Sequence, residues 1–209
     1  MKRIGLLCLA LVLALGALGV GFAMWFDTVT VTGTVNTGDV AWEVEGPLTN
    51  SDSLGTLDWN CFFDLNGGDF VQMDKDVGET EVAIVDDHTF SVTIHNAYPY
   101  YTSHVAFKVH GLGSIPLRIW KAEFYDDSGA LVDTIYTSDQ YVYIDFDDNG
   151  DDDFEIWWGN GFGVQLHECD KHDISFDMLL LQPALQGQTY HFTVRLYAIQ
   201  WDEYTAGPL

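Results

Sequence analysis

An acidic segment carries the densest chemistry in this chain. Residues 145–155 hold six aspartates and one glutamate within eleven positions. Oxygen-bearing side chains occupy alternate positions from Asp145 to Asp153, and Gly150 stands in sixth place, where it permits a sharp turn. Calcium accepts six to eight oxygen ligands from such a flexible loop. We therefore expect Ca²⁺ to bind here, with these ligands: Asp145, Asp147, Asn149, Asp151, Asp153 and Glu155.

The pattern differs from an EF-hand. The twelfth position is Ile156 instead of glutamate, and the acid stands one place earlier, at Glu155. Alternating apolar residues on both sides predict strands, so the segment is expected to close a β-hairpin. A plain Asn-Gly hairpin turn with solvated acids is the alternative. If calcium binds, another loop or another subunit is expected to complete its coordination.

A second, weaker candidate lies earlier in the chain. Asp64, Asn66 and Asp69 surround Gly67-Gly68, a spacing that suits a hard cation. Glycine-rich aspartate turns are also common without a metal. The segment His167–His172 matches no helical zinc motif, and the chain contains no His-Glu-x-x-His. With no nucleophile elbow either, the sequence predicts a protein that is not an enzyme.

The elements that must position these residues are expected to be strands. Apolar residues alternate with polar ones in several runs, for example Phe90, Val92 and Ile94. We expect strands near these ranges: 39–45, 56–64, 80–85, 89–94, 105–109, 118–125, 142–146, 154–158, 174–180 and 192–198. No helical period follows the first residues of the chain. About ten short strands predict an all-β, antiparallel, jelly-roll-like β-sandwich over residues 37–209.

The N-terminus predicts export. Residues 1–23 combine a short basic start, an uncharged apolar run and a small-residue cleavage site, and are expected to form a signal helix that is removed. An uncleaved membrane anchor is the alternative. Either way the body lies outside the cytoplasm, at the cell surface or secreted. In that compartment Cys61 and Cys169 are expected to form one disulfide, with two buried thiols as the alternative.

Charge limits the partners. The 209 residues hold 8 basic and 32 acidic side chains. Without the leader the count is 6 basic and 32 acidic, a net charge of −26. Such a surface repels phosphate backbones, so nucleic acid is not expected as a partner, whereas divalent cations are. After cleavage no membrane contact is expected.

The first mature segment, residues 24–36, is expected to act as a donor strand. Residues 28–36 are uncharged, lack proline and have high β-propensity. Phe26 precedes the run, and Val29, Val31 and Val35 share one face of it. Such a segment pairs with an open sheet edge, in its own subunit or in a neighbour. Head-to-tail donation does not close on itself and therefore builds filaments or tubes from one subunit type.

Several motifs resemble a known family. The apolar leader runs into the threonine- and valine-rich strand Phe26–Val35, Asn96–Pro99 ends a strand, and Gln200–Tyr204 closes the last one. The chain is similar to the camelysin/TasA-like group of exported fibre-forming proteins, most closely to archaeal subunits of bundling pili and of the extracellular tubes called cannulae. The resemblance implies a jelly-roll subunit that polymerises by donor-strand complementation, with calcium as an assembly factor.

Two alternative functions remain open at this stage. The name camelysin comes from a proposed protease activity, so a cell-surface metalloprotease is one alternative. The chain is also rich in tryptophan and tyrosine, and Trp157-Trp158 and Tyr98–Tyr101 could form a sugar-binding platform. A monomeric surface glycan-binding module is therefore the other. We favour a non-enzymatic filament or tube subunit, relevant to a biofilm matrix, that binds calcium and self-assembles.

Overall fold

The computed structural model describes residues 2–21, 37–52, 55–64, 67–139, 141–159 and 161–204. The chain divides into two units, Met1–Thr37 and Gly38–Leu209. The predicted donor strand, with Phe26, Val29, Val31 and Val35, lies outside the described residues, as does Asn66. Each unit is therefore considered by itself.

The first unit contains one helix, α1 (Lys2–Gly21). Leucine, which favours helix strongly, is the commonest residue in its sequence. Its described side chains, residues 4–15, are exposed. Within the part of the chain that is described, no helix is sufficiently long and apolar to cross a membrane.

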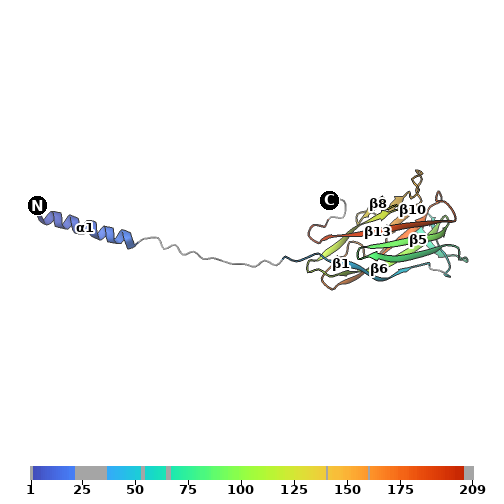
Figure 1. Cartoon of the computed structure of the whole chain (residues 1–209), viewed down its shortest axis with the longest axis horizontal. Coiled ribbons are helices and arrows are strands. Elements are labelled where there is room, and N and C mark those ends of the chain that lie inside the picture. The colour runs from blue at the N-terminus through green and yellow to red at the C-terminus, as the bar shows by residue number, and fades with distance from the viewer. Residues whose placement is uncertain are drawn as a thin grey trace. The chain divides into compact units, whose positions relative to one another are not determined.

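The second unit is an antiparallel β-sandwich, which confirms the predicted fold class (Figure 1). Two sheets can be traced among the described residues. Sheet A has seven strands, in the order β3 (Gly67–Gln72), β2 (Trp59–Asp64), β6 (Tyr101–Gly111), β12 (Lys171–Leu180), β10 (Phe154–Trp158) and β9 (Val142–Ile144), with β1 (Trp42–Asn50) also on β6. Sheet B has six, in the order β11 (Gln165–Leu166), β7 (Leu117–Tyr125), β13 (Gln188–Gln200), β5 (Thr89–Ala97) and β4 (Glu79–Asp86), with β8 (Leu131–Tyr136) on β7.

Alternating apolar residues from both sheets fill the space between the layers. Aromatic rings dominate this core, as when Phe90 of sheet B packs 5.8 Å from Phe176 of sheet A. Phe124 and Phe192 lie side by side in sheet B, with ring centroids 6.1 Å apart. All four side chains are buried. Burying an aromatic side chain stabilises a fold by about 2–3 kcal/mol, so this layer holds the two sheets together.

Three strands were not expected from the sequence. β8 was not recognised because Asp133 interrupts its apolar alternation, although Ile135, two residues further along the strand, is buried. β3 begins at the glycine pair Gly67-Gly68, which reads as a turn. β11 has only two residues, Gln165 and Leu166, too few for any periodicity. β1 also begins later than predicted, at Trp42, where it starts to pair with Gly111 of β6.

The predicted disulfide between Cys61 and Cys169 is wrong for this fold. Cys169 is a free, exposed cysteine in the turn that follows β11, and its amide donates to Gly111 O at the end of β6. Cys61 lies on β2, which pairs with β6 at the opposite end, where Asn60 faces Tyr101. Ten residues of extended chain separate these ends, about 33 Å at 3.3 Å per residue. A disulfide needs Cα atoms within about 7 Å, so these two cysteines cannot bridge within one chain.

Two buried aspartates fix the approach to β2 and β4. Asp58 accepts hydrogen bonds from the amides of Val77 (2.9 Å) and Gly78 (3.2 Å), just before β4. Asp52 accepts from Thr56 Oγ1 (2.8 Å), while its backbone oxygen takes the amide of Thr80. Both aspartates are fully buried. Asp58 therefore ties the segment before β4 to the start of β2.

Replacing Asp58 by alanine should lower the free energy of unfolding by about 2–3 kcal/mol, because two amides would lose a charged acceptor. Urea denaturation of the purified chain measures the change. Asp74→Ala is the matched control, since Asp74 is an exposed acid of the β3–β4 connection that also holds Val77 and Gly78, and a shift within about 0.5 kcal/mol is expected for it. Equal effects of the two substitutions would contradict the role of Asp58.

Candidate metal centre

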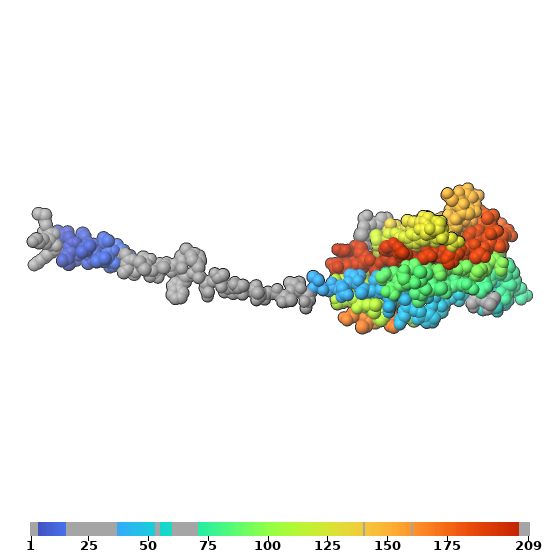
Figure 2. All heavy atoms as spheres, in the orientation of Figure 1, coloured from blue at the N-terminus to red at the C-terminus, as the bar shows by residue number. Residues whose placement is uncertain are grey.

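The acidic segment forms the loop of a β-hairpin, as the sequence predicts. β9 and β10 pair through Ile144 with Phe154 and Val142 with Ile156. The amide of Asp153 donates to Ile144 O at 2.8 Å and closes the base of the loop. Figure 2 shows the tip, in the gold of residues near 150, projecting from the body of the sandwich. The loop therefore has a rigid base and an exposed tip.

Side chains of the loop shape its turn. The amide of Gly150 donates to Asp145 Oδ2 at 2.8 Å, and the amide of Asn149 donates to Asp147 Oδ1 at 3.2 Å. Asn149 Oδ1 in turn accepts the amide of Asp151 at 2.8 Å. Gly150 has a φ of 93°, in a region that side chains other than glycine rarely adopt. The glycine requirement inferred from the sequence therefore has a conformational basis.

Three carboxylates converge at the base of this turn. Asp145, Asp147 and Asp153 each present an oxygen, and these three oxygens lie within 4.8 Å of one another. Among the described histidine, cysteine, aspartate and glutamate residues, this is the group of three or more that could share an ion. All its donors are hard carboxylate oxygens, which suit calcium, magnesium or manganese better than zinc.

Asp153 is the unusual member of the group. Its side chain is only 1% exposed, at the point where the loop enters the core. Oδ2 accepts the amide of Phe146 at 2.9 Å. Oδ1 is buried and has no hydrogen-bond partner within the described part of the chain. A buried carboxylate oxygen without a partner is costly, and a bound cation is one way in which proteins satisfy it.

The electrostatics of the three acids differ. Burial raises the pKa of Asp153, and the nearby charges of Asp147 and Asp145 raise it further. Asp145 has a lowered pKa, chiefly because the amide of Gly150 stabilises its charged form. Asp145 is thus held ionised at the surface, while the buried Asp153 resists ionisation. A divalent cation between them would favour the charged form of both.

The oxygen separations fit the size of calcium. Calcium binds oxygen at 2.3–2.6 Å, so two ligands on opposite sides of one ion lie up to about 5 Å apart. The three carboxylate oxygens of the cluster lie within 4.8 Å of one another, which satisfies this condition. Asp145, Asp147 and Asp153 would hold the ion, and the ion would neutralise most of their charge.

The other predicted ligands do not join this group. The Asn149 side chain and the amide of Asp151 are bonded to each other in the turn. Glu155 lies on β10 opposite Leu179, beyond the loop. Of the expected ligands, the structure brings together the carboxylates of Asp145, Asp147 and Asp153, and calcium binding by any of the six residues stays a prediction. The second candidate is not described: Asp64 and Asp69 have defined backbone but no described side chains, and Asn66 is outside the described residues.

Sequence reasoning missed a histidine–carboxylate pair on sheet A. His104 Nδ1 lies 2.8 Å from Asp177 Oδ1, on the adjacent strands β6 and β12. A pocket of about 310 Å³ lies beside the pair and is also lined by Trp59 and Ser51. The hydrogen bond that His104 donates to the Asp177 carboxylate raises the pKa of His104. Cross-strand register brings the two residues together from 73 positions apart, which no local pattern reveals.

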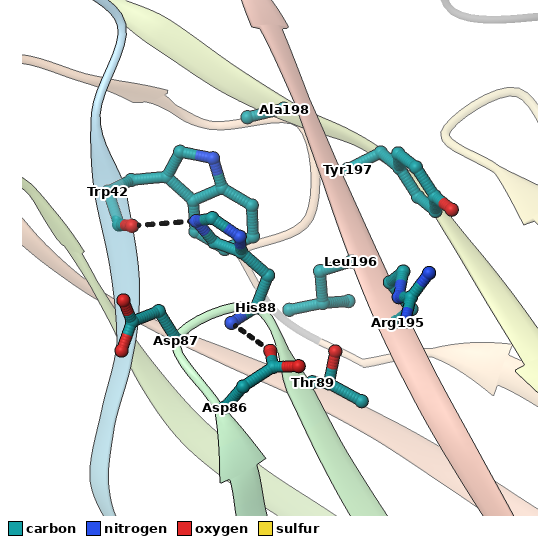
Figure 3. Close-up of a pocket in the computed structure, with 9 residues that line it drawn as sticks. All are labelled: Trp42, Asp86, Asp87, His88, Thr89, Arg195, Leu196, Tyr197 and Ala198. Carbon is teal, nitrogen blue, oxygen red and sulfur yellow. Dashed lines mark hydrogen bonds between the residues drawn. The ribbon is translucent and has the colours of Figure 1, made fainter.

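A larger pocket of about 470 Å³ lies where the β4–β5 turn meets β13 (Figure 3). The His88 ring packs 4.2 Å from the Trp42 ring, and its Nε2 lies 2.9 Å from Trp42 O. Asp86 Oδ1 accepts the amide of His88, and Arg195 lies on the other wall. The motif His167–His172, by contrast, contains a tight turn in which Asp170 Oδ2 accepts the amide of His167.

Substituting any one acid of the cluster by asparagine should weaken calcium binding at least tenfold in calorimetry, since each removes a charged ligand. Asp152→Asn is the matched control, because Asp152 is an exposed acid of the same loop outside the cluster. Calcium should also raise the unfolding temperature of the parent chain by mass action. In Asp153→Asn that gain should vanish, while the chelated protein should keep at least the parent's stability, because a buried charge is removed. Equal calcium affinity in Asp153→Asn and Asp152→Asn would contradict the site.

The His104–Asp177 pair predicts a pH dependence of stability. A histidine whose pKa rises on folding adds stability that is complete below its unfolded pKa, about 6.5, and is lost as pH rises through the folded pKa. Asp177→Asn should therefore destabilise the chain more at pH 5.5 than at pH 8.5 in urea titrations. Asp173 lies on β12 with Asp177 and pairs with Lys108. Asp173→Asn removes that pair and should show no such difference. A pH-independent effect of Asp177→Asn would exclude this coupling.

Known proteins do not assign this chain to a family. No protein-family model matches it, and neither does any curated protein or solved structure. The geometry of the acidic loop and the charge of the chain therefore carry the argument for function.

Proposed function

We propose that this chain is an exported structural subunit that polymerises outside the cell, with calcium bound in the 145–153 loop. The single observation that carries the proposal is the convergence of Asp145, Asp147 and the buried Asp153. Such a site gives an acidic extracellular protein a specific use for the divalent cation around it. The resemblance to exported fibre-forming proteins points in the same direction.

Charge supports a role for calcium in assembly. Without residues 1–23, a subunit of net charge −26 repels its own copies. Half of its six basic side chains are paired with acids: Lys108 pairs with Asp173 at 2.5 Å, Lys171 pairs with Glu45 at 2.5 Å, and Lys121 pairs with Glu123. Little positive charge is left to attract a neighbour. Divalent cations bound where the acids are densest would reduce the repulsion, which monovalent salt only screens.

The sequence supplies a means of polymerisation. Residues 28–36 form an uncharged run, mostly threonine and valine, that is separated from the predicted leader by four residues. A strand of this kind adds to an open sheet edge through backbone hydrogen bonds and buries its apolar side chains. Because each subunit would give one strand and accept one, the product is an open polymer.

The composition of the metal cluster favours this proposal over a metalloprotease. Hydrolytic zinc sites use histidine together with carboxylate ligands and keep one position for water. The three-residue group found among the described side chains consists of aspartates alone. Its chemistry is that of structural calcium sites.

Assembly should require both calcium and the N-terminal segment. Light scattering and electron microscopy of the chain without its leader should show polymer in millimolar calcium and little in chelator. Deleting residues 24–36 should abolish polymer while circular dichroism still reports a folded sandwich. Asp152→Asn should assemble like the parent, whereas Asp153→Asn should need more calcium. Normal filaments from the deletion variant would contradict the proposed function.

A further inference from the structure

The outer face of sheet A carries a row of polar and aromatic side chains. Trp157 of β10 lies opposite Asp177 of β12, and Asp177 lies opposite His104 of β6. Residues directly opposite each other in a sheet point to the same face. Ile156 and Phe176, which precede two members of the row, are buried in the core. Because successive residues of a strand point to opposite faces, the row faces outward.

Aromatic side chains flank this row on both sides. Tyr141, just before β9, and Tyr143 on β9 are 45% and 44% exposed, with ring centroids 5.1 Å apart. Val142 between them packs against the core, so both rings lie on the outer face. On the other side, Trp59 of β2 lies opposite Thr102, two positions before the histidine of the row. From β9 to β2 there are four strand spacings, about 19 Å.

A pocket lies on this face beside the histidine–aspartate pair. Its volume is about 310 Å³, and its walls are Ser51, Trp59, Thr102, His104 and Asp177. Small-molecule sites begin at about 300 Å³. The amide of His104 donates to Ser51 Oγ at 2.9 Å, which fixes one wall. The pocket is therefore built on hydrogen-bonded strands and is formed before any ligand arrives.

The pair presents polar atoms to this pocket. His104 Nδ1 is bonded to Asp177 Oδ1 at 2.8 Å, and Nε2 and Oδ2 take no part in that bond. The two side chains are 42% and 15% exposed. A Cβ at Gly159 would lie 3.4 Å from Asp177 Oδ2 and 2.4 Å from Ser175 Oγ, although the backbone at Gly159 is not left-handed. The missing side chain at Gly159 therefore leaves room beside the carboxylate.

These features match a sugar chain. A pyranose ring has an apolar face of C–H groups that stacks on aromatic rings, and its hydroxyl groups both donate and accept hydrogen bonds. Several linked rings fit along a face of about 19 Å. Acidic sugars are disfavoured because Glu155 lies on the same face, opposite Tyr143. Cationic ligands are disfavoured because Asp177 already holds His104, whose pKa is raised.

This platform differs from the ones that the sequence suggested. Trp157 and Trp158 are neighbours on β10 and point to opposite faces, so they cannot form one surface. The Trp158 ring stacks on Phe162 against the core. Tyr101 is buried as well. Cross-strand register, and not sequence proximity, gathers the outer aromatic residues.

We propose that the outer face of sheet A, centred on the His104–Asp177 pair, binds an uncharged polysaccharide. One sugar occupies the pocket, where His104 Nε2 and Asp177 Oδ2 bond its hydroxyl groups. Neighbouring sugars of the chain stack on Trp157 and Tyr143. The inference goes beyond the proposed function and needs no calcium. A polymer of such subunits would hold polysaccharide along its surface.

A glycan array tests the site. The purified chain is applied in chelator to immobilised neutral and uronic-acid oligosaccharides, so that calcium-dependent assembly adds nothing to binding. We expect retention on neutral hexose oligosaccharides and none on uronic-acid chains. Single hexoses should be retained more weakly, because one ring contacts only part of the aromatic face.

Variants locate the binding surface by calorimetry with the neutral oligosaccharide that the array retains best. Trp157→Ala should weaken its affinity at least tenfold, because truncating a tryptophan at the centre of an interface is costly. Tyr143→Ala, at an exposed margin, should weaken it at least threefold and keeps the test valid if Trp157→Ala unfolds. Trp201→Ala is the matched control and should bind like the parent, since Trp201 is 48% exposed and directly follows β13 of sheet B. Circular dichroism reports the folding of each variant.

Several outcomes would overturn the inference. Retention of no neutral oligosaccharide would do so, as would parent-like affinity in folded Trp157→Ala or in Tyr143→Ala. An equal loss in Trp201→Ala would remove the assignment to sheet A, and a preference for uronic-acid chains would contradict an uncharged ligand. Polymer formation in calcium is measured separately, so this inference and the proposed function can fail independently.

Discussion

The acidic loop depends on the hydrogen bonds of Asp153, whose carboxylate is buried. Oδ2 accepts the amide of Phe146, and the amide of Asp153 donates to Ile144 O. Because Asp153 immediately precedes β10, these two bonds tie the end of β9 to the start of β10. The Phe146 ring stacks 5.0 Å from Phe192 in the core. A change at Oδ1, the one oxygen left without a described partner, would therefore reach the packed interior as well as the loop tip.

Charge sets the main condition on association. A chain of net charge −24 resists contact with its own copies. The acidic loop lies between β9 and β10, at one margin of sheet A. Under the proposed function, calcium bound in this loop would reduce the repulsion between neighbouring copies.

The sequence predicted the fold class well because sheet periodicity is local. Strands such as β5 and β13 alternate clearly between buried and exposed residues, and each was expected near its observed range. β8 was missed because Asp133, a partly buried acid, interrupts its apolar alternation. An acid can occupy this position because β8 lies at an edge of its sheet, and edge position depends on the whole sheet and not on neighbouring residues.

The geometry of the candidate metal centre could be predicted only in part, and for a similar reason. Spacing along the loop placed all the expected ligands near one turn, but it could not show that the carboxylates of Asp145, Asp147 and Asp153 converge while the Asn149 side chain accepts a backbone amide. The burial of Asp153 follows from Phe154, which draws the end of the loop into the core. Pairs that meet across strands, such as His104 with Asp177, and the separation of Cys61 from Cys169 depend on register, which the sequence did not define.

Anomalous diffraction from crystals grown in calcium would test the central claim most directly. The account predicts an anomalous peak bonded to carboxylate oxygens of Asp145, Asp147 and Asp153, at about 2.3–2.6 Å from each. Oδ1 of Asp153 should be one of those ligands. A structure in saturating calcium with no peak at these oxygens, and with Asp153 Oδ1 bonded to a water molecule or protonated, would contradict it.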